Sequence, residues 1–202
     1  MTEALLFLRQ LFTNPKDISA IAPSSRWLGR AMAHDLGPDT GRVVEFGPGT
    51  GRLTEAILAS GVAPRDLTLF EMNSDFADHL RRRFPGVTLH HTGAQEAPNR
   101  IQGTVGAVIS GLPLLSMPAL IRESIVRAAA DILAPDGIFV QFTYGPRPPV
   151  SDDLLARLGL EVDAGRKVWL NLPPATVYTF RKKPAANSVY DGMPIDSARA
   201  RS

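Results

Sequence analysis

The sequence has no cysteine and few histidines, and both shortages narrow the chemistry open to it. Without cysteine among its 202 residues, the chain has no disulfide, no thiolate zinc site, no iron–sulfur cluster and no cysteine nucleophile. The four histidines are His34, His79, His90 and His91. The adjacent pair would point to opposite faces of a strand, which is poor geometry for chelation. We therefore expect no metal site.

The chain also lacks a strong charge imbalance and a membrane-spanning run. Lysine and arginine number 22 against 20 acidic residues, a formal net charge of +2, which disfavours a dedicated nucleic-acid binder. The longest uncharged run, residues 101–121, contains three glycines and two prolines, so we do not interpret it as a membrane span. With 44% hydrophobic residues, the composition is typical of one soluble globular domain.

From residue 42 onward, short apolar strands alternate with helical stretches. We expect strands at 42–46, 67–71, 87–91, 105–109 and 138–144, and helices at 51–60, 73–84 and 118–133. This alternation predicts an α/β fold with a mostly parallel, doubly wound sheet. A helix at 151–158 and strands near 160–170 and 176–182 follow, and the tight connection between the strands predicts an antiparallel pair at the sheet edge. Before the sheet we expect a helix at 24–36, capped by Ser24 or Ser25.

The strongest local signal is the loop Glu-Phe-Gly-Pro-Gly-Thr-Gly at 45–51, which follows a strand and opens a helix. Its glycines let backbone N–H groups approach a bound group closely. A dinucleotide fingerprint would need glycine at position 52, where Arg52 stands. Glu45 favours a cationic amino group over a pyrophosphate, which it would repel. Glu71 lies 20 residues after Gly51, at the end of the next strand, where a carboxylate can accept both ribose hydroxyl protons.

Further motifs lie after the other strands, and together they point to one family. The matching segments are Ile-Ala-Pro-Ser-Ser at 21–25, the loop at 45–51, Phe-Glu at 70–71, Ser-Gly-Leu-Pro-Leu-Leu at 110–115, Gln-Phe-Thr-Tyr-Gly-Pro at 141–146 and Asn-Leu-Pro-Pro-Ala-Thr-Val-Tyr at 171–178. In this order they resemble bacterial S-adenosylmethionine-dependent phosphatidylethanolamine N-methyltransferases, the phospholipid N-methyltransferase family. The resemblance implies a Rossmann-like class I methyltransferase fold, with a mostly parallel seven-stranded sheet and an antiparallel edge strand.

The implied activity is stepwise methylation of phosphatidylethanolamine towards phosphatidylcholine. The implied cofactor is S-adenosyl-L-methionine, with S-adenosyl-L-homocysteine as product. We expect it to contact Glu45, Gly47, Gly49, Thr50, Gly51, Glu71, Met72, Ala94, Gln95 and Ser110. Many methyltransferases carry Asp where Ala94 stands, so a backbone N–H of Ala94 or Gln95, or the Gln95 amide, would have to hold the adenine edge instead.

A sulfonium donor is already activated, so such an enzyme needs positioning more than a strong acid or base. Our hypothesis has Tyr144 and Ser110 at the lipid amine, with the Tyr144 ring stabilising the methylammonium by cation–π attraction, worth about 0.5–2 kcal/mol. Simple packing is the alternative for Tyr144. The remaining substrate-binding candidates are Ser24, Ser25, Arg26 and Tyr178.

The first 15 residues have the pattern of an amphipathic helix, with a membrane-binding face of Leu5, Leu8, Arg9, Leu11 and Phe12. Docking of this helix on the core is the alternative, and the resemblance favours the membrane. The methyltransferase domain then spans 16–183, and 184–202 is expected to be a flexible tail. We expect a cytoplasmic protein bound peripherally to the inner face of the bacterial membrane, with anionic lipids as partners and neither nucleic acid nor metal.

Three other functions stay open. One is methylation of another aminolipid, such as an ornithine lipid, or of a small molecule. A second is an rRNA adenine dimethyltransferase, although Leu114 stands where those enzymes have an aromatic residue that stacks a flipped base. The third is a non-enzymatic, cofactor-binding membrane protein.

Overall fold

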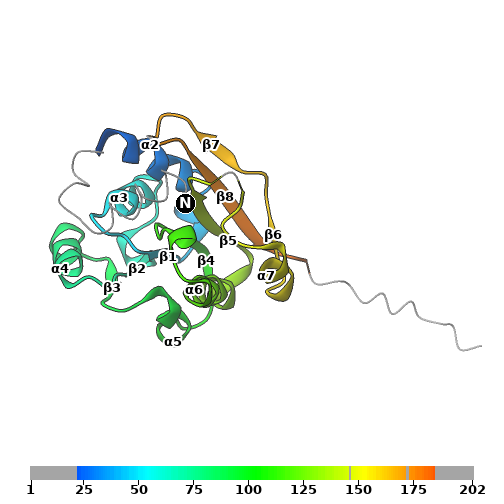
Figure 1. Ribbon diagram of the computed structural model, residues 1–202. Helices are drawn as coiled ribbons and strands as arrows, with labels where there is room; N and C mark the ends of the chain where they lie inside the picture. Colours follow the sequence, from blue (N-terminus) through cyan, green and yellow to red (C-terminus); the bar gives the residue numbers. More distant parts are fainter. Residues whose placement is uncertain (1–21, 146, 172, 185–202) are drawn as a thin grey trace, which may run out of the picture.

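The computed structural model describes residues 22–145, 147–171 and 173–184, and its centre is one sheet with the strand order β3-β2-β1-β4-β5-β8-β6 (Figure 1). The strands are β1 (Val43–Phe46), β2 (Leu67–Phe70), β3 (Thr88–His90), β4 (Val105–Ser110), β5 (Leu133–Thr143), β6 (Leu160–Val162), β7 (Arg166–Val168) and β8 (Ala175–Lys182). The first five strands are parallel to one another, and β8 runs antiparallel to β5, β6 and β7. The expected α/β fold with a mostly parallel sheet is confirmed.

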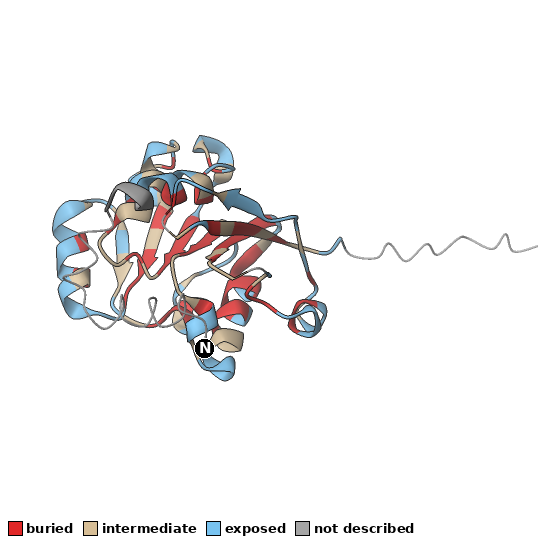
Figure 2. Cartoon of the chain, turned by 45° about the horizontal axis from the view of Figure 1, so that its top comes forward, coloured by how far each residue is buried: buried red, intermediate tan, exposed pale blue. Residues whose placement is uncertain are grey.

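Helices cover both faces of this sheet. They are α2 (Ala22–Met32), α3 (Arg52–Ala59), α4 (Ser74–Arg83), α5 (Ala97–Arg100), α6 (Ala119–Ile132) and α7 (Asp152–Arg157). The first three contribute to the hydrophobic cluster on one face, and α5, α6 and α7 to the cluster on the other. Figure 2 shows the resulting layers, with red buried strands between helices whose outer sides are pale blue.

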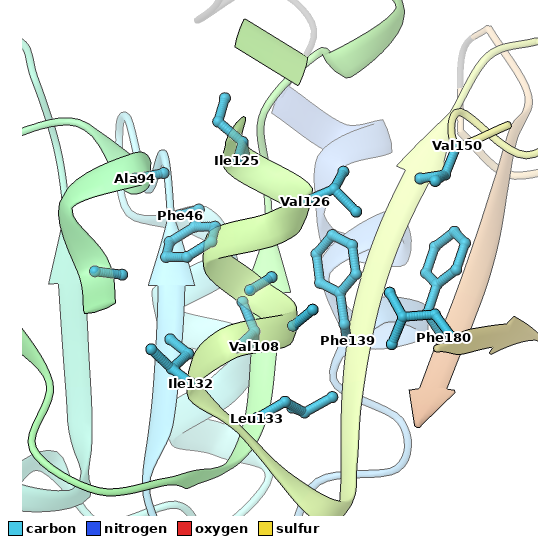
Figure 3. Close-up of a cluster of buried hydrophobic side chains, with 14 of the residues drawn as sticks. Phe46, Ala94, Val108, Ile125, Val126, Ile132, Leu133, Phe139, Val150 and Phe180 are labelled. Carbon is cyan, nitrogen blue, oxygen red and sulfur yellow. The ribbon is translucent and has the colours of Figure 1, made fainter. Parts of the chain in front are cut away.

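Burial on both faces explains why the central strands are mostly apolar, with polar residues near their carboxyl ends. All four residues of β1 are buried, as expected for a parallel strand between two helical layers. In Figure 3, Phe46 and Phe139 of the strands pack against Val126 and Ile132 of α6. Phe139 also stacks on Phe180 of β8, with ring centroids 5.3 Å apart. This packing fixes the order of the strands whose ends carry the site.

The expected antiparallel pairing at the edge of the sheet is confirmed, because β6 and β7 pair antiparallel with β8, which lies beyond β5. Two other sequence predictions about the elements were wrong. The segment 160–170 forms two short strands, β6 and β7, so the sheet has eight strands among the described residues instead of seven. Helix α2 begins at Ala22, so Ser24 and Ser25 lie inside its first turn instead of capping it. The fixed φ of Pro23 suits a first helical turn, which accounts for the early start.

The predicted N-terminal helix at 1–15, with Leu5, Leu8, Arg9, Leu11 and Phe12, lies outside the described residues. So does the predicted flexible tail at 184–202, apart from its first residue. In the described part of the chain, no helix combines the length and apolarity needed to cross a bilayer.

Candidate active site

The carboxyl ends of four parallel strands meet at one edge of the sheet. Residue pairing sets Phe46 of β1 between Phe70 of β2 and Ser110 of β4, and Ser110 beside Gln141 of β5. The strand order reverses at this point, because β2 lies on one side of β1 and β4 on the other. Ligands in open α/β sheets bind at such a switch point, outside the carboxyl ends of the strands. Four of the sequence motifs therefore lie together.

The glycine loop after β1 has a backbone that only glycine adopts readily. Gly47 and Gly49 have φ of +67° and +54°, in the left-handed region. The Gly47 N–H donates to the Phe70 carbonyl at 3.0 Å, and a Cβ on Gly47 would collide with the Leu112 side chain. A Cβ on Gly49 would meet no atom within 4 Å. The loop is thus packed on its Gly47 side and open at Gly49, as a cradle for a bound group requires.

Glu71 joins the two loops that follow β1 and β2. One carboxylate oxygen accepts the Gly49 N–H at 3.0 Å, and the other accepts the Asn73 N–H at 2.8 Å. Each oxygen has a further lone pair, so the carboxylate can still accept two hydroxyl protons of a ribose. The sequence predicted Glu71 as a ribose ligand, and the structure brings it to the glycine loop.

Glu45 is fully buried beneath α3. Its Oε2 accepts the Thr54 hydroxyl at 2.7 Å, whereas its Oε1 has no hydrogen-bond partner within the described part of the chain. Burial raises the pKa of Glu45 from 4.5 to about 8, the Thr54 hydrogen bond opposes the rise, and the charge of Glu71 adds to it. A buried carboxyl with a free oxygen is suited to receiving a cation, because a positive charge would restore its ionised form.

Gln141 holds the loop that follows β4. Its Nε2 donates to the carbonyls of Leu112 and Phe142, both at 2.9 Å, and its buried Oε1 meets no partner among the residues that the structure describes. Ser110 is fully buried, and its Oγ accepts the Leu112 N–H at 3.3 Å. No role was predicted from the sequence for Gln141 or Thr54. A single amide inside the apolar strand Ile-Phe-Val-Gln-Phe was the available signal for Gln141.

Tyr144 follows β5 and is held by a residue from the loop between β7 and β8. Asn171, which is buried, donates from Nδ2 to the Tyr144 Oη at 3.4 Å and to the Pro173 carbonyl at 2.8 Å. The Tyr144 ring packs edge-on against Phe142, with centroids 5.4 Å apart. Burial raises the pKa of the Tyr144 phenol above its usual 10.0, and the Asn171 bond opposes this. The phenol is therefore protonated at neutral pH and cannot act there as a base.

The predicted adenine contacts follow β3. Ala94 is buried and Gln95 is exposed, with its amide folded against Gly93. Met72 is 70% exposed, and its carbonyl oxygen lies 2.9 Å from His91 Nε2. Burial lowers the pKa of His90, which packs against Phe70, and the charge of Arg100 adds to this.

The remaining substrate candidates are more dispersed. Arg26 is exposed on α2, and Ser24 and Ser25 lie at the start of that helix. Tyr178 is buried in the cluster beneath α6, whereas Tyr144 joins the cluster on the α2 side. The structure thus does not bring the two tyrosines together. Among the residues that the structure describes, no three His, Asp or Glu side chains gather to hold a metal ion.

Known proteins similar to this chain include a lipid methyltransferase and ribosomal RNA methyltransferases. No family model matches the chain. It is 34% identical over 155 residues to the ornithine lipid N-methyltransferase of Singulisphaera acidiphila, covering 72% of this chain and 80% of that protein. It is 44% identical over only 62 residues, 29% of this chain and 22% of the other, to the ribosomal RNA small subunit methyltransferase A of a Synechococcus species.

Solved structures support the fold. The Burkholderia thailandensis 1,6-didemethyltoxoflavin-N1-methyltransferase, solved with 1,6-didemethyltoxoflavin and S-adenosylhomocysteine, has a TM-score of 0.63 at 16% identity, covering 90% of this chain and 88% of that one. The lipid methyltransferase match extends over most of both proteins, and the glycine loop and Glu71 lie at the switch point of the sheet. The chain therefore belongs to the family of the ornithine lipid N-methyltransferase, among the class I S-adenosylmethionine-dependent methyltransferases.

Proposed function

We propose that the protein transfers methyl groups from S-adenosylmethionine to the primary amine of a membrane aminolipid. The observation that carries this proposal is the split of charge across the site. Carboxylates lie at the carboxyl ends of β1 and β2, whereas the polar side chains at the ends of β4 and β5 are neutral. A cationic cofactor suits the first side, and an amine that must lose its proton suits the second.

The residues at the carboxyl ends of β1 and β2 have the groups needed to bind S-adenosylmethionine. Glu45 has an unpartnered oxygen for the methionine ammonium, and Glu71 has free lone pairs for the ribose hydroxyls. Gly49 leaves open space where a side chain would intrude. When bound, the cofactor supplies an electrophilic methyl group on a sulfonium.

The residues at the carboxyl ends of β4 and β5 orient the amine. A lipid ammonium has no lone pair for attack, so its proton must first leave to water. Gln141 Oε1 and Tyr144 Oη are neutral acceptors that can bind the remaining N–H groups without favouring the ammonium, as a carboxylate would. Ser110 and Gln141 fix the intervening loop through Leu112, which limits the directions in which the amine can approach.

We propose phosphatidylethanolamine as the substrate, from the motif resemblance, with phosphatidylcholine as the end product. An ornithine lipid is the second candidate, and the 34% identical relative favours it. Both present a primary amine on a lipid headgroup. The enzyme would then work at the inner face of the bacterial cytoplasmic membrane, attached in part by residues 1–15.

The decisive experiment supplies labelled S-adenosylmethionine with vesicles that contain phosphatidylethanolamine, an ornithine lipid, or neither. Chromatography of the extracted lipids should show label in the aminolipid samples only, and the labelled species identifies the substrate and the number of methyl groups. Label in 16S rRNA, supplied in a parallel reaction, with none in lipid would refute the proposal. Deleting residues 1–13 should reduce vesicle sedimentation while S-adenosylhomocysteine binding persists, and unchanged sedimentation would reject the helix as an anchor.

A further inference from the structure

A cationic, aromatic surface lies where α2 meets β7, outside the residues that hold the cofactor and the amine. We name it the Trp27–Trp169 surface, and it consists of Trp27, Arg30, Arg166, Lys167, Trp169 and Leu170. Trp27 is 47% exposed, Trp169 70% and Leu170 64%. A hollow of about 410 Å³ lies between the helix and the strand. Both tryptophans of the chain belong to this surface.

The charge of this surface has one sign. The Lys167 ammonium lies 4.2 Å from the centroid of the Trp169 ring, and the Arg30 guanidinium lies 5.6 Å from that of Trp27. Among the described residues, no acidic side chain lines the hollow. Arg30, Arg166 and Lys167 take part in none of the ion pairs found within the described ranges. The positive charge is therefore available to an outside anion.

The composition of the surface identifies the partner. Tryptophan favours the headgroup level of a bilayer, where its ring is in apolar surroundings and its N–H stays near water. Transfer of the exposed Leu170 side chain from water to the boundary between headgroups and acyl chains is favourable, because the side chain is apolar. Lysine and arginine beside such residues bind anionic headgroups. RNA fits less well, because a cation already occupies a face of each ring that a base would use for stacking.

The position of this surface connects it with the site. Leu170 directly precedes Asn171, whose amide donates to the Tyr144 hydroxyl. Thr176 of β8 pairs with Lys167 of β7 on one side and with Thr143, at the end of β5, on the other. The surface thus lies at the same edge of the sheet as the site, and its two elements, α2 and β7, are neighbours in Figure 1.

We propose that the Trp27–Trp169 surface docks on an anionic bilayer and sets the mouth of the site against it. Trp169 and Leu170 enter the headgroup region, and Arg166 and Lys167 bind lipid phosphates. The inference rests on the proposed function for the location of the substrate. It is independent of residues 1–15, which would attach the protein without fixing which side faces the lipid.

The two tryptophans are the reporters for the test. In Trp27→Phe the remaining emission comes from Trp169 alone, and in Trp169→Phe it comes from Trp27 alone. Vesicles of phosphatidylcholine with 30% phosphatidylglycerol should shift both emissions to the blue, and brominated lipids should quench them. Unshifted and unquenched emission from protein that sediments with the same vesicles would overturn the proposal, because binding would then use another surface.

Charge variants give a second readout. Arg166→Gln with Lys167→Gln should weaken vesicle binding about tenfold, since each basic residue near an anionic surface adds roughly a fivefold preference or less. Arg65→Gln with Arg82→Gln, which removes two exposed arginines elsewhere, should change it less than twofold. Equal effects of the two pairs would overturn the proposal. So would a structured RNA that competes with vesicles for the tryptophans.

Failure of this inference is distinguishable from failure of the proposed function. Lipid methylation with tryptophans that stay in water would reject the surface and keep the activity. Inserted tryptophans without any methylated lipid would support the surface and reject the activity.

Discussion

In the cofactor-free protein, Glu45→Gln should remove a large part of the pH dependence of stability between pH 4.5 and 8. Burial raises the pKa of Glu45 from 4.5 to about 8, so the folded protein retains a proton that the unfolded chain releases in this range. The free energy of unfolding of the wild type therefore falls as the pH rises through it. At about 1.4 kcal/mol per pH unit, the contribution of Glu45 amounts to at most roughly 5 kcal/mol.

The assay is urea unfolding at several pH values between 4 and 9, for the wild type and for Glu45→Gln. A glutamine keeps an acceptor for the Thr54 hydroxyl but carries no ionisable proton. Any fixed energetic effect of the amide is the same at every pH and drops out of the slope. The difference in stability between the two proteins should change by several kcal/mol from pH 4.5 to 8. A difference that stays constant within about 1 kcal/mol would refute the assignment of a buried, neutral Glu45.

Two further measurements test whether the proton on Glu45 is the cause of this pH dependence. Thr54→Val removes the hydrogen bond that lowers the pKa of Glu45, so its pH-dependent window should extend to higher pH. Binding of S-adenosylhomocysteine near pH 6.5 should release close to one proton from Glu45 as the ligand ammonium favours the carboxylate. Calorimetry in buffers of different ionisation enthalpy counts that proton, and Glu45→Gln should not release it.

Other substitutions test the site more briefly. Glu71→Gln should weaken S-adenosylhomocysteine binding about 10- to 100-fold in calorimetry, because charge-assisted hydrogen bonds to the ribose are lost; unchanged affinity would contradict this. Gly47→Ala should lower stability by more than the roughly 1–2 kcal/mol expected from positive φ, because its Cβ meets Leu112. Gly159→Ala is the matched control, because Gly159 has a similar φ of +63° and its Cβ would meet no described atom within 4 Å. Tyr144→Phe should lower kcat on vesicles about tenfold without changing cofactor affinity, and full activity of Tyr144→Ala would exclude a catalytic role.

The parallel part of the fold could be predicted from the sequence because its signals are local. Apolar runs bounded by turn residues located β1 to β4 to within a few residues. The second half of the sheet was harder, since β6 and β7 have three residues each and are defined by pairing with β8. Pairing between strands that are distant in the sequence produces no periodic pattern of apolar residues from which it could be predicted. The sequence therefore predicted the antiparallel pairing at the sheet edge correctly, but it did not predict that 160–170 divides into two strands.

The candidate site likewise combines residues that local sequence patterns predict with residues that only the folded chain brings together. Glu45, Gly47, Gly49 and Glu71 follow from the spacing of one loop and the next strand. Their partners do not, because the sequence does not state which side chains a buried polar atom will meet. Asn171 reaches Tyr144 across 27 positions of the chain, and its contribution depends on the turn between β7 and β8.

A substitution at Gln141 can test whether the neutral acceptors beside the amine keep its pKa low enough for deprotonation. Gln141→Glu would put an ionisable carboxyl where the buried Oε1 has no partner. An ionised carboxylate there stabilises the lipid ammonium, so the amine deprotonates only at higher pH. The rising limb of the pH–rate profile should therefore move to higher pH, and the rate should reach its plateau at a higher pH than in the wild type. Gln141→Met is the control, because it also loses the amide that holds Leu112 but adds no charge, and it should lower the rate without moving the profile. Identical profiles for the two variants would show that the amine does not reach Gln141, and its role would then be confined to the loop.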